Sequence, residues 1–407
     1  MSKVCLEEEY NSLLSSEVKH VLQICSRVAN KYKFPLYLIG GIVRDLIMNK
    51  QIYDIDLLVE GNAILFAKKL EGCGVCKIIQ LQNNLKTAKV LFENLLEVDI
   101  ASTRCEVYDN PGELPVVKEI SCSLSEDVVR RDFTINSMAL SLNKDNMFEL
   151  IDYLNGYKDI EKKELNVLHE KSFLDDPSRI VRGLKFSLRF GFELGNDTKK
   201  LQEDYLSCHN NVMPLERVKN EFKQLFLLNN PEAFDRVISE KIYKLISSKP
   251  FPDVDGTKIK STLYKFDILS DDIWLIYLGI LVFNEDEQTF ARLNLSGKEK
   301  RIIVEAKQLY DNRAVEKSDD YKIYKFFEGI NESSLAIYYS LTGDEDAVKY
   351  SIKLSAVKLE ITGSDLIQMG FVPSVEFGQT LNEVLKQKLL GNVVSKQDEI
   401  NFVKRFL

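Results

Sequence analysis

Two aspartates that are separated by one residue form the first group that could do chemistry. Asp54 and Asp56 lead into the apolar run Leu57-Leu58-Val59. Alternate residues of a strand face the same side, so a strand here would project both carboxylates together. Such carboxylates repel each other unless cations lie between them, and two Mg²⁺ ions roughly 4 Å apart serve this purpose in phosphoryl transfer. A lone Asp-x-Asp is usually a solvated strand edge, so the metal interpretation needs a second signal.

That second signal is a glycine pair. Gly40-Gly41 follows an apolar segment at 36–39 that is typical of a strand, and a helical pattern follows at 43–48. A tight turn there would present bare backbone N–H groups and a helix N-terminus to an anionic phosphate. A glycine pair alone is mostly just a turn. Followed by the two aspartates, it predicts a phosphate cradle beside a two-metal site, which means nucleotide chemistry.

A third carboxylate lies on a predicted hairpin. The segments 88–92 and 95–101 flank the polar pair Glu93-Asn94, and Asp99 lies on the second arm. By itself Asp99 would be a polar-face strand residue. Beside Asp54 and Asp56 it predicts the carboxylate that completes a two-metal site and helps to deprotonate the attacking hydroxyl.

The string Arg130-Arg131-Asp132-Phe133-Thr134-Ile135-Asn136 carries charged and polar groups at the start of a predicted helix. The adjacent arginines offer planar donors to a phosphate. Asp132 and Asn136 are four residues apart, so they would share one helix face and could hold a ribose or orient the arginines.

A second charged helix is predicted after Asp175-Asp176-Pro177. At 100° per residue its positive face carries Arg179, Arg182, Lys185 and Arg189. Asp176 and Arg179 are three apart, which would place one acceptor beside one forked donor. Cytosine and adenine both present an amine donor next to a ring-nitrogen acceptor, whereas guanine and uracil present the inverse. The pair therefore predicts selection of CTP and ATP, and the alternative is a solvated amphipathic helix.

Composition limits the class of protein. The 407 residues can bury more than one core, with 45% hydrophobic and 29% charged residues. A net charge of −8 is unusual for a nucleic-acid binder, so RNA contacts would need a local basic surface.

Seven scattered cysteines indicate reduced thiols, and Cys73-Gly-Val-Cys76 lacks a second pair that would complete a zinc site. The longest apolar run, at 273–283, is too short to cross a bilayer, so we expect a cytoplasmic protein without membrane contact.

The pattern along the chain predicts an α+β protein. Short apolar runs alternate with helical patterns over about residues 1–145, and from Ile151 onward the pattern is helical throughout. A Pro/Gly/Asp-rich stretch at 250–256 is the clearest interior break.

Four strings together resemble one known family. Gly40-Gly-Ile-Val-Arg-Asp45, the Asp-x-Asp pair, the string at 130–139 and Asp175-Asp-Pro-Ser-Arg179 resemble the motifs of class II tRNA nucleotidyltransferases and bacterial poly(A) polymerases. Further strings at 152–159 and 214–221 resemble the same family, so the strong resemblance covers about residues 36–225, and weaker similarity follows at 361–370 and 390–395. The resemblance implies a palm-like nucleotidyltransferase head at 1–145, a helical neck at 146–225 with the nucleotide-selecting helix, a helical body at 226–300 and a tRNA-binding tail at 301–407.

The resemblance also implies an activity: Mg²⁺-dependent, template-independent addition of CMP and AMP from CTP and ATP to the 3′ end of tRNA, with release of pyrophosphate. Asp54 and Asp56 would hold both metals, and Asp99 would assist the attacking hydroxyl. The implied nucleotide-binding residues are Gly40, Gly41, Arg44, Arg131, Asp132, Asn136, Asp176, Arg179, Arg182 and Lys185. Lys185 stands where many members of the family carry arginine. Lysine keeps the positive charge of arginine but lacks its two parallel donors.

Other members of this family would carry the same strings. A CC-adding enzyme, an A-adding enzyme and a poly(A) polymerase remain alternatives within the catalytic class. A non-catalytic RNA-binding relative is the alternative outside it, and three clustered carboxylates near a phosphate backbone disfavour that alternative.

Overall fold

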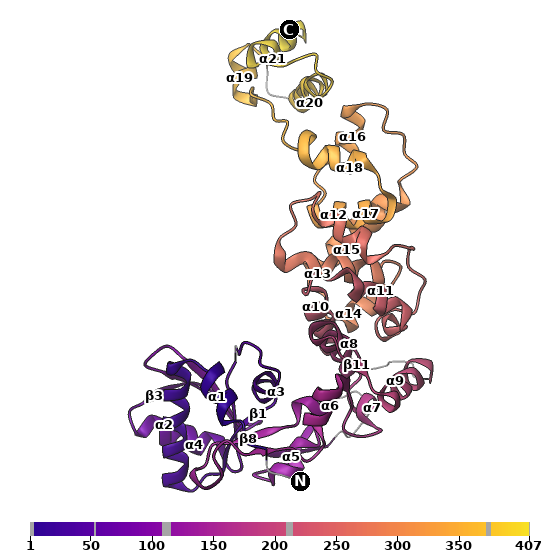
Figure 1. Cartoon of the computed structure of the whole chain (residues 1–407). Coiled ribbons are helices and arrows are strands. Elements are labelled where there is room, and N and C mark those ends of the chain that lie inside the picture. The colour runs from indigo at the N-terminus through magenta and orange to yellow at the C-terminus, as the bar shows by residue number, and fades with distance from the viewer. Residues whose placement is uncertain (1–3, 53, 108–114, 209–214, 372–375, 407) are drawn as a thin grey trace. The chain divides into compact units, whose positions relative to one another are not determined.

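The structure is a computed structural model that describes residues 4–52, 54–107, 115–208, 215–371 and 376–406. It divides into two compact units, Met1–Arg217 and Val218–Leu407 (Figure 1). All of the predicted site residues belong to the first unit, so its elements are described first.

A seven-stranded sheet organises the first unit. Its strands are β1 (Leu36–Ile39), β2 (Asp56–Val59), β3 (Cys76–Gln82), β4 (Thr87–Phe92), β5 (Glu97–Ser102), β8 (Ala139–Ser141) and β9 (Leu150–Ile151). The strand order is β3-β4-β5-β2-β1-β8-β9. Strands β2 and β5 pair in parallel, and every other pair in this sheet is antiparallel.

The helices of the first unit cover the sheet and continue beyond it. They are α1 (Glu7–Leu13), α2 (Ser16–Tyr32), α3 (Gly41–Ile47), α4 (Ala63–Gly72), α5 (Leu124–Val128), α6 (Gly156–Lys162), α7 (Ser172–Asp175), α8 (Ser178–Phe190) and α9 (Asn196–Cys208), with α10 (Glu216–Phe226) at the boundary. Side-chain caps begin several of them: the Ser15 hydroxyl accepts from the backbone N–H of Val18, and the Asn62 side chain accepts from that of Leu65.

Alternation along the strands gives the sheet two buried faces. Leu57 and Val59 of β2 belong to the large core, to which α2 and α4 contribute side chains. Leu58, between them, belongs to a smaller cluster with Leu124 and Val128 of α5. Side chains two residues apart share a face, so Asp56 lies on the same face as Leu58 and α5.

Two smaller pairs of strands complete the first unit. Strands β6 (Arg104–Val107) and β7 (Val116–Ile120) form an antiparallel ribbon. Strands β10 (Glu164–Leu165) and β11 (Glu193–Leu194) form a parallel pair. The expectation that strands end near Ile151 is therefore wrong in detail, because strands of two residues are too short to show an alternating pattern. Short 3₁₀ turns occur at Thr134–Asn136 and Lys144–Asn146.

The second unit is helical throughout the part that the structure describes. Its α-helices are α11 (Pro231–Ser239), α12 (Gly256–Leu263), α13 (Ile273–Leu281), α14 (Glu287–Arg292), α15 (Gly297–Asp311), α16 (Asp320–Phe327), α17 (Glu332–Thr342), α18 (Glu345–Lys349), α19 (Gly363–Gln368), α20 (Glu376–Leu389) and α21 (Lys396–Val403). Shorter turns lie at Ile242–Leu245, Ser270–Asp272, Tyr350–Leu354 and Lys404–Phe406.

The α+β fold predicted from the pattern is confirmed, as are the strand at Leu36–Ile39 and the hairpin of β4 and β5. The predicted break at 250–256 falls in irregular backbone before α12, which Asp255 caps. Within the described ranges, no helix is both long and apolar enough to cross a membrane.

Candidate active site

The three predicted carboxylates lie together on one face of the sheet. Asp56 begins β2 and stands directly opposite Asp99 of β5 in the parallel register. Asp54 lies two residues before Asp56, just outside the strand, with the buried Ile55 between them. The backbone N–H of Asp99 donates to the Ile55 carbonyl at 3.1 Å, so the pairing extends past the end of β2 and keeps the alternation.

The electrostatics of this cluster are those of crowded negative charge. The pKa of Asp56 is raised, first by burial and next by the charge of Asp99, with Asp54 adding to the effect. Two cations oppose these shifts: Arg131, and Lys89, whose Nζ lies 3.3 Å from Asp99 Oδ2. Lys89 stands opposite Asp99 in the antiparallel pairing of β4 and β5, a contact that sequence spacing gave no means of finding.

The donor set suits a hard divalent cation. Carboxylate oxygens are the ligands that Mg²⁺ prefers, and here they come from three positions on a rigid sheet. Burial and then the charge of Asp99 raise the pKa of Asp56, and a bound cation would relieve the repulsion between the two carboxylates. Asp54, Asp56 and Asp99 therefore fit the metal that the nucleotidyltransferase resemblance implies.

Gly40 forms the turn after β1, and the Arg131 guanidinium lies close to it. Its φ of +76° lies in the left-handed region that favours glycine. A Cβ at this position would lie 3.3 Å from Arg131 Nη1 and 3.6 Å from the Asn136 carbonyl oxygen. The turn thus needs glycine for its backbone conformation, and it also admits the guanidinium that reaches the carboxylate cluster. Gly41, the next residue, begins α3.

A chain of polar contacts runs beneath this turn. The Arg44 guanidinium donates to Asp45 Oδ1 at 2.9 Å and to Asn136 Oδ1 at 2.6 Å. Asn136 donates in turn to Asp132 at 3.0 Å, and Asp132 Oδ2 accepts two bonds from Arg182, at 2.8 and 2.6 Å. Each side chain hydrogen-bonds to the next one, and these bonds together fix the orientation of all five side chains.

Arg44, the first member of this series of polar contacts, is almost fully buried, with 5% of its surface exposed. Its guanidinium packs over the Phe190 ring at 4.5 Å. The guanidinium bonds to Asp45 and Asn136, so Arg44 holds these two side chains in place beside the turn.

The segment 130–136 differs from the predicted helix. Only Thr134–Asn136 is helical, as a single 3₁₀ turn, and Phe133 instead forms a β-bridge with Val167. Asp132 accepts from the backbone N–H of Phe133, which stabilises the non-helical bend. Asp132 and Asn136 do contact each other, but the bend brings them together and a shared helix face does not.

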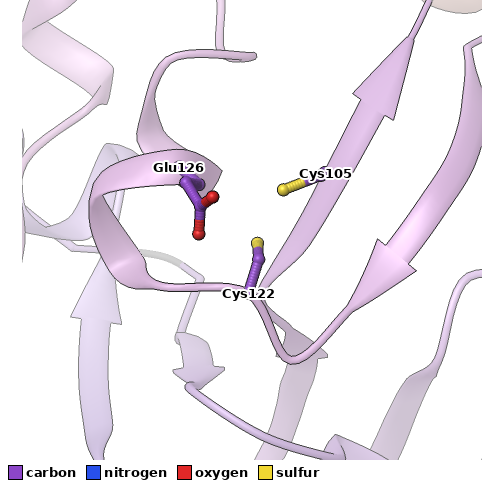
Figure 2. Close-up of side chains that lie close together, drawn as sticks. All are labelled: Cys105, Cys122 and Glu126. Atoms are coloured by element: carbon purple, nitrogen blue, oxygen red, sulfur yellow. The ribbon is translucent and has the colours of Figure 1, made fainter.

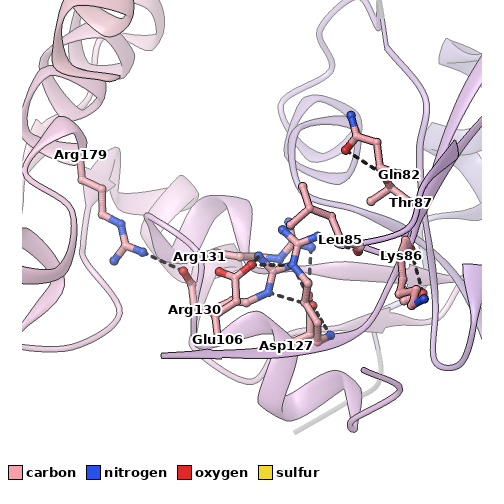
Figure 3. A network of polar contacts seen from close by, with 11 residues as sticks. Gln82, Leu85, Lys86, Thr87, Glu106, Asp127, Arg130, Arg131 and Arg179 are labelled. Atoms are coloured by element: carbon pink, nitrogen blue, oxygen red, sulfur yellow. Dashed lines mark hydrogen bonds and ion pairs between the residues drawn. The ribbon is translucent and has the colours of Figure 1, made fainter. Parts of the chain in front are cut away.

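Asp127 is a site residue that sequence reasoning missed. It is fully buried in α5, and its carboxylate accepts from Arg130 at 2.9 and 3.0 Å, from Arg131 at 3.1 Å and from the backbone N–H of Arg104 at 3.0 Å (Figure 3). Glu106 of β6 bonds to both Arg104 and Arg130. The spacing of three and four residues from Asp127 to the arginine pair was the available signal.

The charge state of Asp127 follows from this network. Burial alone would raise the pKa of its carboxyl, but the charges of Arg131 and Arg130 outweigh burial and hold the pKa below its usual value. Asp127 therefore carries a full negative charge at neutral pH, and it positions Arg131 toward the carboxylate cluster.

We expect Asp127→Asn to lower the free energy of unfolding by about 3 kcal/mol, because it removes the carboxylate that bonds the mostly buried guanidinium of Arg131 and leaves Arg130 with Glu106 alone. The native pKa of Asp127 is lowered, so its stabilisation is fully present above the unfolded pKa and should begin to shrink below about pH 4. Denaturant midpoints at pH 7 and pH 3.5 measure both effects. Glu119→Gln makes the same chemical change on an exposed residue of β7, and equal midpoints for the two variants at pH 7 would contradict this role.

Asp176 and Arg179 are both buried, and each bonds to other groups. Asp176 has extended backbone between α7 and α8, and it accepts from the backbone and hydroxyl of Ser178 and from Arg217. Arg179 donates to the Ser172 hydroxyl at 2.7 Å and to the Arg130 carbonyl at 2.8 Å (Figure 3). Asp176 is therefore not on a helix face as expected, because α8 begins only at Ser178.

The positive side of α8 is not a solvated face. Arg179 and Lys185 are 3% and 9% exposed, and the Arg182 side chain is one-third exposed and paired with Asp132. Only Arg189 is open to solvent. Charged side chains are costly to bury unless they are paired, and here Arg179 is paired with the Arg130 carbonyl and Arg182 with Asp132.

Residues 36–166 match the family model of the poly A polymerase head domain. The A-adding tRNA nucleotidyltransferase of Halalkalibacterium halodurans is 28% identical over 97% of this chain and 94% of its own length. That of Geobacter sulfurreducens is 28% identical over 95% of this chain, which spans only 46% of the relative. The CCA-adding enzyme of Streptococcus gordonii is 27% identical over 91% of this chain and 93% of its own length.

Solved structures agree on the fold. An apo form of a CCA-adding enzyme superposes with a TM-score of 0.82 and 23% identity, covering 100% of this chain and 99% of that one. The CCA-adding enzyme of Thermotoga maritima in complex with tRNA gives a TM-score of 0.74 at 21% identity, covering 100% and 99%. Residues 36–166 therefore match the poly A polymerase head domain, and A-adding tRNA nucleotidyltransferases and CCA-adding enzymes are homologous to this chain over most of its length.

Proposed function

We propose that this chain adds CMP and AMP to the 3′ end of tRNA without a nucleic-acid template, using CTP and ATP and releasing pyrophosphate. The observation that carries the proposal is the placement of Asp54, Asp56 and Asp99 on one face of the sheet with Arg131 beside them. A cluster of acids next to a fixed guanidinium suits a triphosphate and its metal ions. The same cluster would repel a nucleic-acid backbone in a protein that only binds RNA.

The acidic residues would hold the divalent metal and orient the attacking hydroxyl. Asp54 and Asp56 would supply its main ligands, and Asp99, exposed on the neighbouring strand, would face the 3′ hydroxyl of the tRNA. Bound Mg²⁺ would neutralise charge on the phosphates and favour ionisation of that hydroxyl. Lys89 would release Asp99 as the ion binds, because both compete for the same carboxylate oxygen.

Arg131 would stabilise the negative charge of the phosphates. Its guanidinium is already oriented by Asp127 and lies where a Cβ at position 40 would be 3.3 Å away, so little conformational entropy is lost when a nucleotide binds. Arg182 is held by Asp132 through two bonds and remains partly exposed, which leaves it able to meet the nucleotide.

Base selection would fall to Asp176 and Arg179, with Lys185 on the same side of α8. Arg217 and Ser178 fix the carboxylate of Asp176, while Ser172 and the Arg130 carbonyl fix the guanidinium of Arg179. Preorganised donors and acceptors discriminate well, because a wrong base would leave buried polar groups unpaired. The helical residues from about 226 onward, with the tail at 301–407, would hold the tRNA mainly through shape and backbone contacts.

A second candidate is addition of the terminal AMP alone. It is favoured by the relatives from Geobacter sulfurreducens, Halalkalibacterium halodurans and Aquifex aeolicus, which are all named A-adding tRNA nucleotidyltransferases. Both candidates include the AMP step, and they differ only in whether CTP is a substrate.

The product ladder on three tRNA substrates decides between them. The substrates end before CC, after the first C and after CC, and each is incubated with CTP, ATP or both. Full CCA addition predicts extension of all three, and A-only addition predicts extension of the last substrate alone. Extension of none of them, in protein that folds and binds tRNA, would overturn the proposed activity, and runs of many A residues would identify a poly(A) polymerase.

A further inference from the structure

A second cluster of metal-ligating side chains lies at the base of the β6–β7 ribbon. Cys105 belongs to β6, Cys122 follows β7, and Glu126 belongs to α5. The two Sγ atoms and a carboxylate oxygen all lie within 4.8 Å of one another. Figure 2 shows the three side chains directed toward one another from these three elements. The cluster is distinct from the Asp54, Asp56 and Asp99 site, and the proposed activity does not use it.

The spacing is close to that of a metal site. Zinc–sulfur bonds of about 2.3 Å and zinc–oxygen bonds of about 2.0–2.2 Å place tetrahedral ligands roughly 3.3–3.8 Å apart. The three ligand atoms now lie up to 4.8 Å apart, and small rotations of the three side chains would bring them to these distances. Three protein ligands with water in the fourth position are a known arrangement for zinc.

The Glu126 carboxylate is already oriented for this purpose. Its Oε2 accepts from the Ser123 backbone N–H at 2.8 Å and from the Ser123 hydroxyl at 2.6 Å, in a capping box at the start of α5. Both bonds fall on Oε2, so Oε1 can ligate an ion while the cap stays intact. Hydrogen bonds that orient a ligating carboxylate in this way raise metal affinity.

We propose that Cys105, Cys122 and Glu126 bind one zinc ion that ties the β6–β7 ribbon to α5. Binding would release the two thiol protons to solvent and leave a dithiolate–carboxylate site with one open position. The ion would take no part in the proposed tRNA reaction, since neither the ribbon nor α5 supplies the acids of the proposed active site.

A disulfide is the competing use of two adjacent thiols. It would make no use of the Glu126 carboxylate that points at both sulfurs, and this geometry favours a shared ion.

The proposed zinc site lies next to the two acids that hold Arg130 and Arg131 in place. Cys105 immediately precedes Glu106, and Glu126 immediately precedes Asp127. Glu106 and Asp127 are the two acids that bond to Arg130, and Asp127 also holds Arg131. An ion that joins the ribbon to α5 would therefore hold both acids of this network in place.

Cobalt titration of the metal-free, reduced, full-length protein tests the proposal without an activity assay. We expect one Co²⁺ per chain to produce the near-ultraviolet thiolate-to-cobalt charge-transfer band and the visible bands of a tetrahedral site, and Zn²⁺ to abolish both. Carboxylate sites elsewhere cannot produce the thiolate band. Because its readout is spectroscopic, the test can fail while the proposed tRNA activity stands, and the reverse also holds.

Variants locate the ion. Cys105→Ser and Cys122→Ser should each lose the charge-transfer band, and Glu126→Gln should keep the helix cap while weakening Co²⁺ affinity by at least about tenfold. Cys73→Ser, in the other closely spaced cysteine pair, should leave the spectrum unchanged. Absence of the band in the parent protein, or its persistence in both serine variants at 105 and 122, would overturn the proposal. So would a Cys105–Cys122 disulfide in the isolated protein whose reduction restores no Co²⁺ binding.

Discussion

Replacing Asp56 by alanine should reduce nucleotide incorporation at least about a thousandfold, while tRNA affinity stays within a few-fold of the parent. Asp56 stands opposite Asp99 and carries a raised pKa, first from burial and then from the Asp99 charge, so it lies at the centre of the acidic cluster. Loss of a carboxylate that would hold the divalent ion removes several kcal/mol of charge stabilisation that acts in the transition state. Single-turnover incorporation and tRNA binding, measured on the same preparation, separate the two effects.

Glu97→Ala is the matched control for this loss. Glu97 lies on β5 two residues from Asp99, and it shares Lys89 as a partner at the same distance of 3.3 Å. Its removal should change incorporation by only a few-fold, because Asp99, and not Glu97, stands opposite Asp56 in the register of β2 and β5. Appreciable Mg²⁺-dependent incorporation by Asp56→Ala would eliminate the assignment of these carboxylates as the metal site.

The second large effect is expected at Arg179. Replacing it by alanine should lower the rate with ATP and narrow the preference for ATP over GTP by about tenfold or more. Each wrong base leaves desolvated donors or acceptors unpaired, at roughly 1–3 kcal/mol per group, and that penalty disappears with the guanidinium. Incorporation of all four nucleotides onto a tRNA that ends in CC measures the preference.

Partial unfolding does not obscure this result, because a ratio of two nucleotides is independent of the fraction of active protein. That safeguard matters because Arg179 also bonds to Ser172 and to the Arg130 carbonyl, so its loss will reduce stability. Arg189→Ala removes an exposed arginine from the same helix and should leave the preference unchanged. An unaltered preference for ATP in Arg179→Ala would mean that base choice is made by other residues.

Local signals in the sequence were sufficient for the elements around the site. The strand at Leu36–Ile39, the glycine turn and the hairpin of β4 and β5 were all predicted, and the structure contains them. These features depend on residues close in sequence, where alternation and turn chemistry operate directly. The resemblance of four short strings to one family likewise depended on local spacing alone.

Local signals were misleading where tertiary contacts override helix propensity. The segment 130–136 has a helical pattern, yet Phe133 pairs with Val167 and the backbone bends. The positive side of α8 has the pattern of a solvated face, yet Arg179 and Lys185 are buried, and Arg179 donates to the carbonyl of Arg130, 49 residues away in the sequence. Periodicity reports which residues share a face, and it cannot report what covers that face.

The sequence by itself determined which chemistry was available: carboxylates two residues apart, a turn that requires glycine, and arginines beside acids. Only the tertiary structure decided which of these groups meet. The parallel register of β2 and β5 brings Asp56 opposite Asp99, and the packing of α5 on that face sets Asp127 behind Arg131. The same packing brings Cys105, Cys122 and Glu126 together. The physical reason is that pairing and packing between distant segments follow from the burial of the whole core, which no short stretch of sequence encodes.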